Sequence, residues 1–336
     1  MGLRKVRALR GVPSSLWLTL VALVLLLGVA LDPGFASSQP GAGSGRARFP
    51  ASPSRTPHEG SCPILPASNA LNKDISHAPV DPNSASYIDN IGAEVHLHAD
   101  FGTPPSYGIP YAVVGPHQPK VPIHFTEYGE ESNPGPYPIP PSAPVEGAGE
   151  EGDRHVLVLQ EGTCKLYELY AAQRKGPGWD AGSGAVFNLR SNALRPEGWT
   201  SADAAGLPIF PLLVRYPEVR AGRIGHALRV TVQRTQRGYI HPATHLASNS
   251  SDPSLPPMGL RLRLKASFSL AGYHGEALVV LRALERYGLI VADNGSSWYI
   301  TGAPDPRWNN EDLDQLKRVP GSAFEAVRSG PILRRG

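Results

Sequence analysis

The amino-acid sequence predicts a mainly β fold, a two-sheet sandwich of the ConA-like or jelly-roll type with two short helices near the C-terminus. Three observations support this fold class. The 336 residues include Gly 36 and Pro 35, which indicates many turns and few long helices. Hydrophobic residues make up 41%, enough for a sizeable core. The apolar runs are short and bounded by turn residues, which favours a sandwich over a parallel α/β fold.

The N-terminus has the layout of a secretory signal. Basic residues up to Arg10 precede the apolar run 16–31, and GFAS follows, which permits cleavage after Ala36. We therefore expect a signal peptide over residues 1–36 and a secreted, extracellular protein. The alternative is an uncleaved anchor formed by residues 16–31, which would be the only contact with a membrane.

The remainder of the chain is expected to form one domain. Residues 37–61 have few apolar side chains and predict a disordered linker, so a single β-rich domain should span residues 62–330. The signal segment carries the whole net charge of +3. Without it the chain has no basic excess, so a nucleic-acid partner is not expected.

The two cysteines, Cys62 and Cys164, are expected to form a disulfide. An exported protein meets an oxidising compartment, where pairing is the simplest use of two cysteines. Two buried free thiols are the alternative. If bridged, the bond ties the start of the domain to its centre.

The clearest element is a strand pair, 155–160 and 163–170, around Glu161-Gly162. A two-residue loop would place His155 opposite Glu168, whereas a four-residue loop would change that pairing. Both faces of the pair are largely apolar. The pair should therefore lie in the middle of a layered structure.

The elements that follow alternate between loops and strands. Residues 176–211 predict a long irregular segment, and RLRLKASFSL (261–270) predicts a strand whose Arg and Lys side chains face water. The helical spacing of residues 275–287 predicts a helix that Gly288 ends. A second hairpin is expected over 289–302, and a short helix capped by Asn310 after it.

Several signatures of common enzyme classes are missing. The sequence contains no P-loop, GxGxxG, HExxH, CxxC or GxSxG. Nucleotide-dependent, zincin and standard serine-hydrolase chemistries are therefore disfavoured.

A His-rich strand, VHLHADF, is a candidate metal site. In an extended chain His96, His98 and Asp100 project from one face. Imidazole and carboxylate ligands at this spacing suit zinc or a similar divalent metal, the one cofactor that the sequence suggests. The alternative is a solvated polar strand face.

Paired carboxylates are the second candidate. Glu168 lies on an apolar face beside His155, and desolvation of a carboxylate raises its pKa as a general acid requires. The alternative is a structural pair at the end of the sheet. Asp203 or Asp100 is the candidate second carboxylate of a glycosidase.

Tryptophans and aspartates share the loops on either side of these strands. Aromatic rings stack on sugar faces and carboxylates bind hydroxyls, so these loops predict a glycan cleft with a tryptophan platform. Loop packing is the alternative. The expected substrate-binding residues are Trp179, Trp199, Trp298 and Trp308.

Three segments, RPEGWTSADAAGLPI, PPMGLRLRLKASF and LIVADNGSSWYITGAPDPRW, resemble those of a family of exported proteins whose function is uncharacterised. The resemblance covers about residues 62–328. It implies secretion and one continuous domain, and it carries over no catalytic residue, substrate or cofactor.

Together these observations predict a secreted carbohydrate-active protein, a glycoside hydrolase or lyase with Glu168 as acid/base, whose partner is an extracellular polysaccharide or glycan. Two alternatives remain open. One is a non-catalytic glycan-binding or cell-surface protein, and the other is a metal-dependent enzyme.

Overall fold

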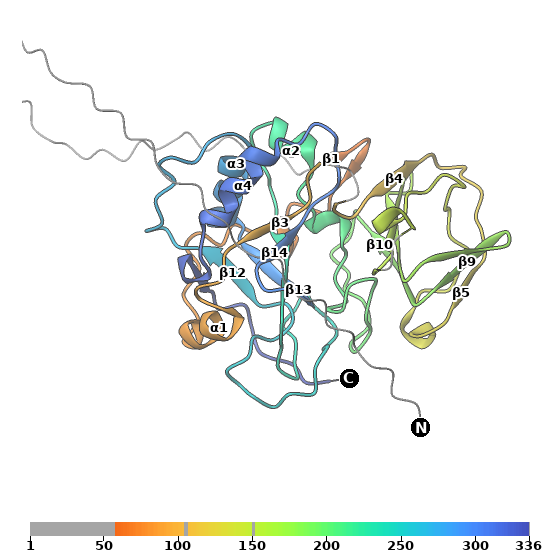
Figure 1. Ribbon diagram of the computed structural model, residues 1–336. Coiled ribbons are helices and arrows are strands. Elements are labelled where there is room, and N and C mark those ends of the chain that lie inside the picture. Colours follow the sequence, from red (N-terminus) through yellow and green to blue (C-terminus); the bar gives the residue numbers. More distant parts are fainter. Residues whose placement is uncertain (1–57, 104–106, 150–151, 336) are drawn as a thin grey trace, which may run out of the picture. The chain divides into compact units, whose positions relative to one another are not determined.

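The computed structural model describes residues 58–103, 107–149 and 152–335. The predicted signal peptide and residues 37–57 of the predicted linker lie outside these ranges. The described chain is mainly β, as predicted. Its strands form four sheets, not the two expected for a sandwich (Figure 1). None of its helices is both long and apolar enough to cross a membrane.

The largest sheet has six strands and mixes parallel with antiparallel pairs. β11 runs parallel to β13, and β14 runs parallel to β3. The strand order is β15 (Phe324–Ala326), β12 (Arg261–Leu264), β13 (Leu289–Asn294), β11 (Leu228–Val232), β14 (Tyr299–Thr301) and β3 (His98–Asp100).

The second sheet has four strands and contains the central strand pair. β4 runs parallel to β6, and the other pairs are antiparallel. The order is β10 (Ser183–Asn188), β7 (Lys165–Tyr170), β6 (Val156–Gln160) and β4 (Tyr111–Val114).

Two small sheets complete the β structure. One has the order β5 (Ile123–Phe125), β9 (Gly178–Ala181) and β8 (Gln173–Lys175). The other pairs β1 (His58–Glu59) with β2 (Cys62–Pro63). Strand pairing thus begins by His58, four residues before the predicted start of the domain.

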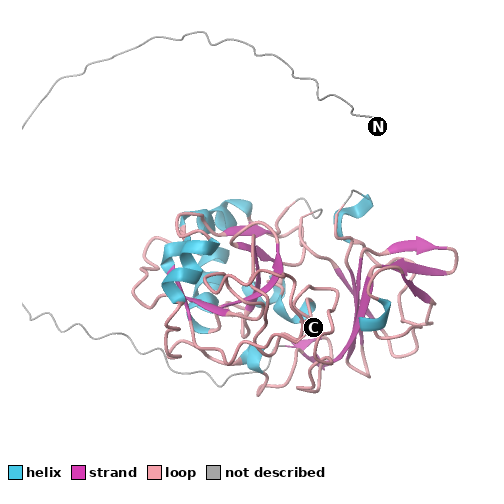
Figure 2. Cartoon of the chain, turned by 90° about the horizontal axis from the view of Figure 1, so that it is seen from below, coloured by secondary structure: helices cyan, strands magenta, loops and turns pink. Residues whose placement is uncertain are grey.

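In the described part of the chain, four α-helices and six 3₁₀ turns connect the strands, and most of them gather beside one group of strands (Figure 2). The α-helices are α1 (Ser84–Ile91), α2 (Tyr216–Arg220), α3 (Gly275–Arg286) and α4 (Asn310–Asp314). The 3₁₀ turns are η1 (Ala70–Asn72), η2 (Gly129–Glu131), η3 (Glu146–Gly149), η4 (Phe210–Leu212), η5 (Gln315–Arg318) and η6 (Gly321–Ala323).

The two helices expected near the C-terminus are confirmed as α3 and α4. Gly288 follows α3 with a φ of 68° and donates its N–H to Ala283, as a C-terminal cap requires. The N-cap of α4 is Asn309, one residue before the predicted Asn310. The short helices α1 and α2 were not predicted, although Tyr87, Ile88 and Ile91 of α1 are buried at helical spacing.

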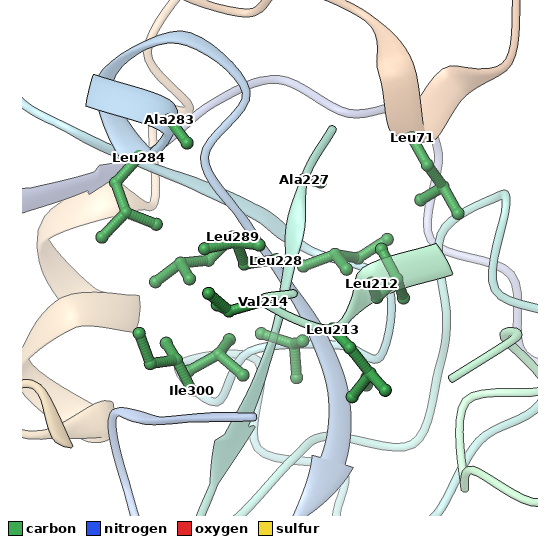
Figure 3. Close-up of a cluster of buried hydrophobic side chains, with 14 of the residues drawn as sticks. Leu71, Leu212, Leu213, Val214, Ala227, Leu228, Ala283, Leu284, Leu289 and Ile300 are labelled. Carbon is green, nitrogen blue, oxygen red and sulfur yellow. The ribbon is translucent and has the colours of Figure 1, made fainter. Parts of the chain in front are cut away.

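One large apolar core joins the two main sheets. It contains Leu228 and Leu289 from the six-stranded sheet together with Leu157 and Leu166 from the four-stranded sheet. The segment 212–214 lies within this core, beside Leu228 and Leu289 (Figure 3). Burying each such leucine fully contributes about 1.5–3 kcal/mol.

The opposite face of the strand pair β6–β7 packs in a second, smaller core. Val156, Val158 and Leu169 contact the same cluster as Trp179 and Ala181 of β9. The predicted burial of both faces of this pair is therefore confirmed.

The predicted pairing within β6–β7 is wrong by two residues. The loop has four residues, 161–164, with φ of 76° at Gly162 and 50° at Cys164. Leu157, not His155, therefore pairs with Glu168. Since side chains alternate with a period of two, a shift of two residues preserves the predicted faces.

The predicted second hairpin is also wrong. β13 and β14 are not neighbours, because β11 lies between them, parallel to β13 and antiparallel to β14. The turn residues between β13 and β14 suit a hairpin, but a strand from a distant segment supplies the hydrogen bonds instead.

The predicted wet face of β12 is buried. Arg261 is 5% and Arg263 is 8% exposed. The guanidinium of Arg261 donates to the carbonyls of Ala70 and Tyr287, and that of Arg263 donates to Glu325 and to the carbonyl of Ile75. Buried arginines are tolerated here because fixed acceptors replace water. The predicted irregular segment 176–211 likewise contains β9 and β10.

Cys62 and Cys164 form the predicted disulfide, with a sequence separation of 102 residues. It ties β2, at the start of the described chain, to the β6–β7 loop. Closing so long a loop removes much of the conformational entropy of the unfolded chain.

We expect replacement of both cysteines by serine to lower the free energy of unfolding by about 2–4 kcal/mol. Denaturant unfolding of both proteins, with and without reductant, measures the change. Reductant should destabilise the natural chain and leave the double variant unaffected. A natural chain that unfolds at the same denaturant concentration with and without reductant would contradict the expectation.

Candidate functional site

Two adjoining hollows lie where the four-stranded and six-stranded sheets meet the segment 200–204. Their cavity volumes are about 360 and 250 Å³. Asp153, Asp293 and Asn294 line both, so the hollows form one cleft. We call it the acidic cleft, because its described lining includes the carboxylates of Asp100, Glu146, Asp153, Asp203 and Asp293.

The segment 200–203 is attached to the four-stranded sheet by polar side chains. His155 contacts the carbonyl of Ala202 at 2.9 Å, and the Ser183 hydroxyl donates to the carbonyl of Ser201 at 2.6 Å. The Ser201 hydroxyl accepts from the N–H of Asp203 within the same turn. These bonds place Asp203 at the wall of the cleft.

Arg229 of β11 links two carboxylates of the cleft. Its Nε and Nη2 donate to the two oxygens of Asp203 at 2.8 and 2.9 Å. Nη2 also donates to Asp293 of β13 at 3.3 Å, and Nη1 donates to the Thr301 hydroxyl. The bidentate bond fixes the orientation of the Asp203 carboxylate. Because Nη2 donates to both aspartates, Asp293 lies beside Asp203.

Asp203 and Asp293 differ in exposure and in role. The Asp203 side chain is completely buried, whereas that of Asp293 is 24% exposed. Burial and the neighbouring charge of Asp203 raise the pKa of Asp293 to about 7, against the opposing charge of Arg229. Asp293 is therefore a carboxylic acid that faces the cleft and exchanges its proton near neutral pH.

His155 and Glu146 form a second charged pair in the cleft. Both nitrogens of His155 contact acceptors, Nδ1 the Glu146 carboxylate at 2.6 Å and Nε2 the carbonyl of Ala202. Both must therefore carry hydrogens, which makes the ring an imidazolium. Burial alone would lower the pKa of His155, but the bond to Glu146 and its charge raise it to about 9.

Glu168, the predicted acid/base, lies away from the cleft. It is fully buried, and its carboxylate accepts the backbone N–H groups of Ile209 and Phe210 at 2.9–3.0 Å. Burial raises its pKa to about 7, although these N–H bonds favour the charged form. His155 and Glu168 thus attach the segment 200–210 to the strand pair β6–β7. Their predicted side-by-side pairing does not occur.

Three of the four predicted platform tryptophans are core residues. Trp179, Trp298 and Trp308 are each at most 4% exposed. The Trp298 ring stacks on Phe324, and the indole N–H groups of Trp298 and Trp308 donate to backbone carbonyls. They cannot present a ring face to a ligand in this arrangement. The fourth, Trp199, is half-buried and lies under the Arg195 guanidinium.

The three predicted metal ligands do not form one group, and His96 precedes β3. His96 is exposed, the His98 ring stacks on Tyr299 at 4.2 Å, and Asp100 lines the acidic cleft. Within the described ranges, no three His, Cys, Asp or Glu side chains are grouped so that they could hold a metal ion. Burial raises the pKa of Asp100.

The aromatic residues of the cleft are tyrosines. Tyr128 and Tyr170 line one hollow and Tyr299 lines the other. Among the charged lining residues, Asp203, Asp100 and His155 were predicted as site residues. Asp293 was expected only as one of the aspartates that share loops with the tryptophans. Arg229, Glu146 and Asp153 were not predicted, because no local spacing marks residues that meet only through the tertiary fold.

No protein-family model, curated protein or solved structure matches the chain.

The His155 imidazolium predicts a loss of stability at alkaline pH. A folded pKa of about 9 lies above the ordinary value of about 6.5, so the contribution is complete below pH 6.5 and disappears as pH rises through 9. Between pH 7 and 10 we expect a loss of about 2–3 kcal/mol that the variant His155→Gln lacks.

Chemical unfolding at the two pH values measures this difference. His241→Gln is the matched control, because His241 also bonds a carboxylate, Glu197, but its side chain is 47% exposed. Other titrating groups are common to all three proteins and cancel. An equal loss in the natural chain and in His155→Gln would show that the ring is not charged in the folded state.

Proposed function

We propose that the protein is a secreted glycoside hydrolase whose general acid is Asp293. The observation that carries this proposal is the Asp203–Arg229–Asp293 cluster in the wall of the acidic cleft. A glycosidase must protonate the oxygen of its leaving group. An acid with a pKa of about 7 that is exposed to a polar cleft is suited to this task.

Each member of the cluster has a separate role in this proposal. Asp203 is buried and its charge raises the pKa of Asp293, while Arg229 holds both carboxylates in place. Asp203 and Arg229 are therefore positioning residues. The hydroxyl and tyrosine groups of the lining supply hydrogen bonds and ring faces for a sugar.

The asymmetry of the two aspartates favours sugar over peptide substrates. In aspartic proteases two carboxylates share a proton and both address the reacting water. Here the carboxylate of Asp203 is fully buried, and Arg229 binds both of its oxygens. Of these two aspartates, only Asp293 is available to a substrate, so the second catalytic carboxylate must come from elsewhere in the cleft.

Asp153 is the proposed second carboxylate. It is exposed, precedes β6, and lines both hollows together with Asp293. Asp153 lies in the segment before β6 and Asp293 lies on β13, so the two carboxylates reach the cleft from different segments of the chain. In this arrangement Asp153 acts as the base or nucleophile that the mechanism needs.

Secretion is part of the same proposal. The disulfide between Cys62 and Cys164 suits an oxidising compartment, and the N-terminal charge and hydropathy pattern suits export.

A panel of polysaccharides, assayed for new reducing ends, tests the hydrolase. We expect Asp293→Asn to lower the turnover of a hydrolysed substrate by about a hundredfold or more, because the acid is lost. The matched control is Asp89→Asn, an exposed carboxylate on α1. A panel without new reducing ends, or an equally active Asp293→Asn, would reject the proposal.

The pH profile tests the role of Asp203. Activity that depends on protonated Asp293 should fall as pH rises through about 7. In Asp203→Asn this fall should move to lower pH, because the charge that raises the pKa of Asp293 is gone. Cooperative thermal unfolding of the variant establishes that it folds. A profile that stays in place would remove Asp203 from the proposed mechanism.

A further inference from the structure

In the acidic cleft, some carboxylates are exposed to solvent, whereas most of the basic side chains are buried and bonded to the protein. Its described lining contains five carboxylates, and its basic side chains are Arg229, His155 and His245. The carboxylate of Asp153 is exposed and that of Asp293 is partly exposed. The basic groups are mainly buried, and each bonds protein acceptors.

Arg229 has its donors engaged by the protein. Its side chain is 6% exposed, and Nε, Nη1 and Nη2 all donate to Asp203, Thr301 or Asp293. An anionic ligand would have to replace these bonds, and removing a buried carboxylate from its guanidinium is costly.

The two histidines also contact protein acceptors, His155 through both ring nitrogens and His245 through one. His155 is 2% exposed at its side chain, and both its nitrogens face protein acceptors. His245 contacts the carbonyl of Ala204 at 2.8 Å, and its other nitrogen lies 3.8 Å from the Glu131 carboxylate. The described lining therefore presents carboxylates to a ligand, while its cationic groups Arg229 and His155 are bonded to the protein.

We propose that the acidic cleft binds saccharides that carry ammonium groups, the chemistry of free amino sugars, in preference to neutral or uronic acid saccharides of the same shape. The inference rests on the proposed function only for the choice of saccharides as ligands. The preference for ammonium groups follows from the cavity, the exposed Asp153 and the bonds that Arg229 and His155 make within the protein. It also disfavours a polyuronide lyase, which must bind a substrate carboxylate.

Asp153 is the specificity residue of this proposal. It lines both hollows and is exposed, so its carboxylate is available to an ammonium group of the ligand. A single pair of opposite charges that is partly exposed to water changes the binding affinity by about three- to tenfold. Salt weakens such a pair, because exposed charges are screened.

The test is calorimetric titration of the full chain with three trimers of one β-1,4 backbone: glucosamine, glucose and glucuronic acid. At about pH 6 the glucosamine groups are charged, and Asp293→Asn can replace the natural chain if turnover interferes. We expect the glucosamine trimer to bind about three- to tenfold more tightly than the glucose trimer, and the glucuronic acid trimer to bind most weakly. High salt should reduce the differences.

The variant Asp153→Asn should remove about threefold of the preference for glucosamine, whereas the exposed control Asp89→Asn should leave it unchanged. Equal affinities, a preference for glucuronic acid, or no binding of the glucosamine trimer would each overturn the inference.

The two proposals fail separately. Binding with the expected preference but without new reducing ends would leave this inference standing and reject the hydrolase. Hydrolysis without any charge preference would do the reverse.

Discussion

Coverage of the strand pair β6–β7 on both faces is the constraint on which the rest of the structure depends. Leu157 and Leu166 face the large core, and Val158 and Leu169 face the small one. A strand pair buried on both sides leaves no room for charged groups along its length unless they are fully bonded. The polar side chains His155 and Glu168 of this pair therefore form hydrogen bonds with the segment 200–210, which leads toward the six-stranded sheet.

His155 and Glu168 illustrate this use of polar groups. Each forms hydrogen bonds with the backbone of the segment 200–210. His155 bonds the carbonyl of Ala202, and Glu168 bonds the N–H groups of Ile209 and Phe210. The same bonds bring Asp203 against Arg229. Hydrogen bonds from the strand pair to this segment thereby place Asp203 beside Arg229 and Asp293, on the inner strands β11 and β13 of the six-stranded sheet.

The two faces of the strand pair β6–β7 and the disulfide were predictable from the sequence. The register of that pair and the partners of strands β13 and β14 were not. The period of two kept the faces of β6–β7 correct even though Leu157, not His155, pairs with Glu168. On β12 the same alternation was misleading, because backbone carbonyls replace water around Arg261 and Arg263. The prediction for Trp298 and Trp308 was wrong for a similar reason, since their indole N–H groups find acceptors inside the core.

The sequence by itself determined a mainly β chain, a buried central strand pair, the Cys62–Cys164 bond and the two C-terminal helices. The strands and helices follow from the spacing of apolar residues and from capping residues within short stretches, and the disulfide follows from the presence of two cysteines. Only the tertiary structure decided which carboxylates meet. Arg229 reaches Asp203 over 26 residues and Asp293 over 64, and the second approach exists because β11 pairs in parallel with β13. Such pairing depends on the packing of whole sheets, which no short stretch of sequence encodes.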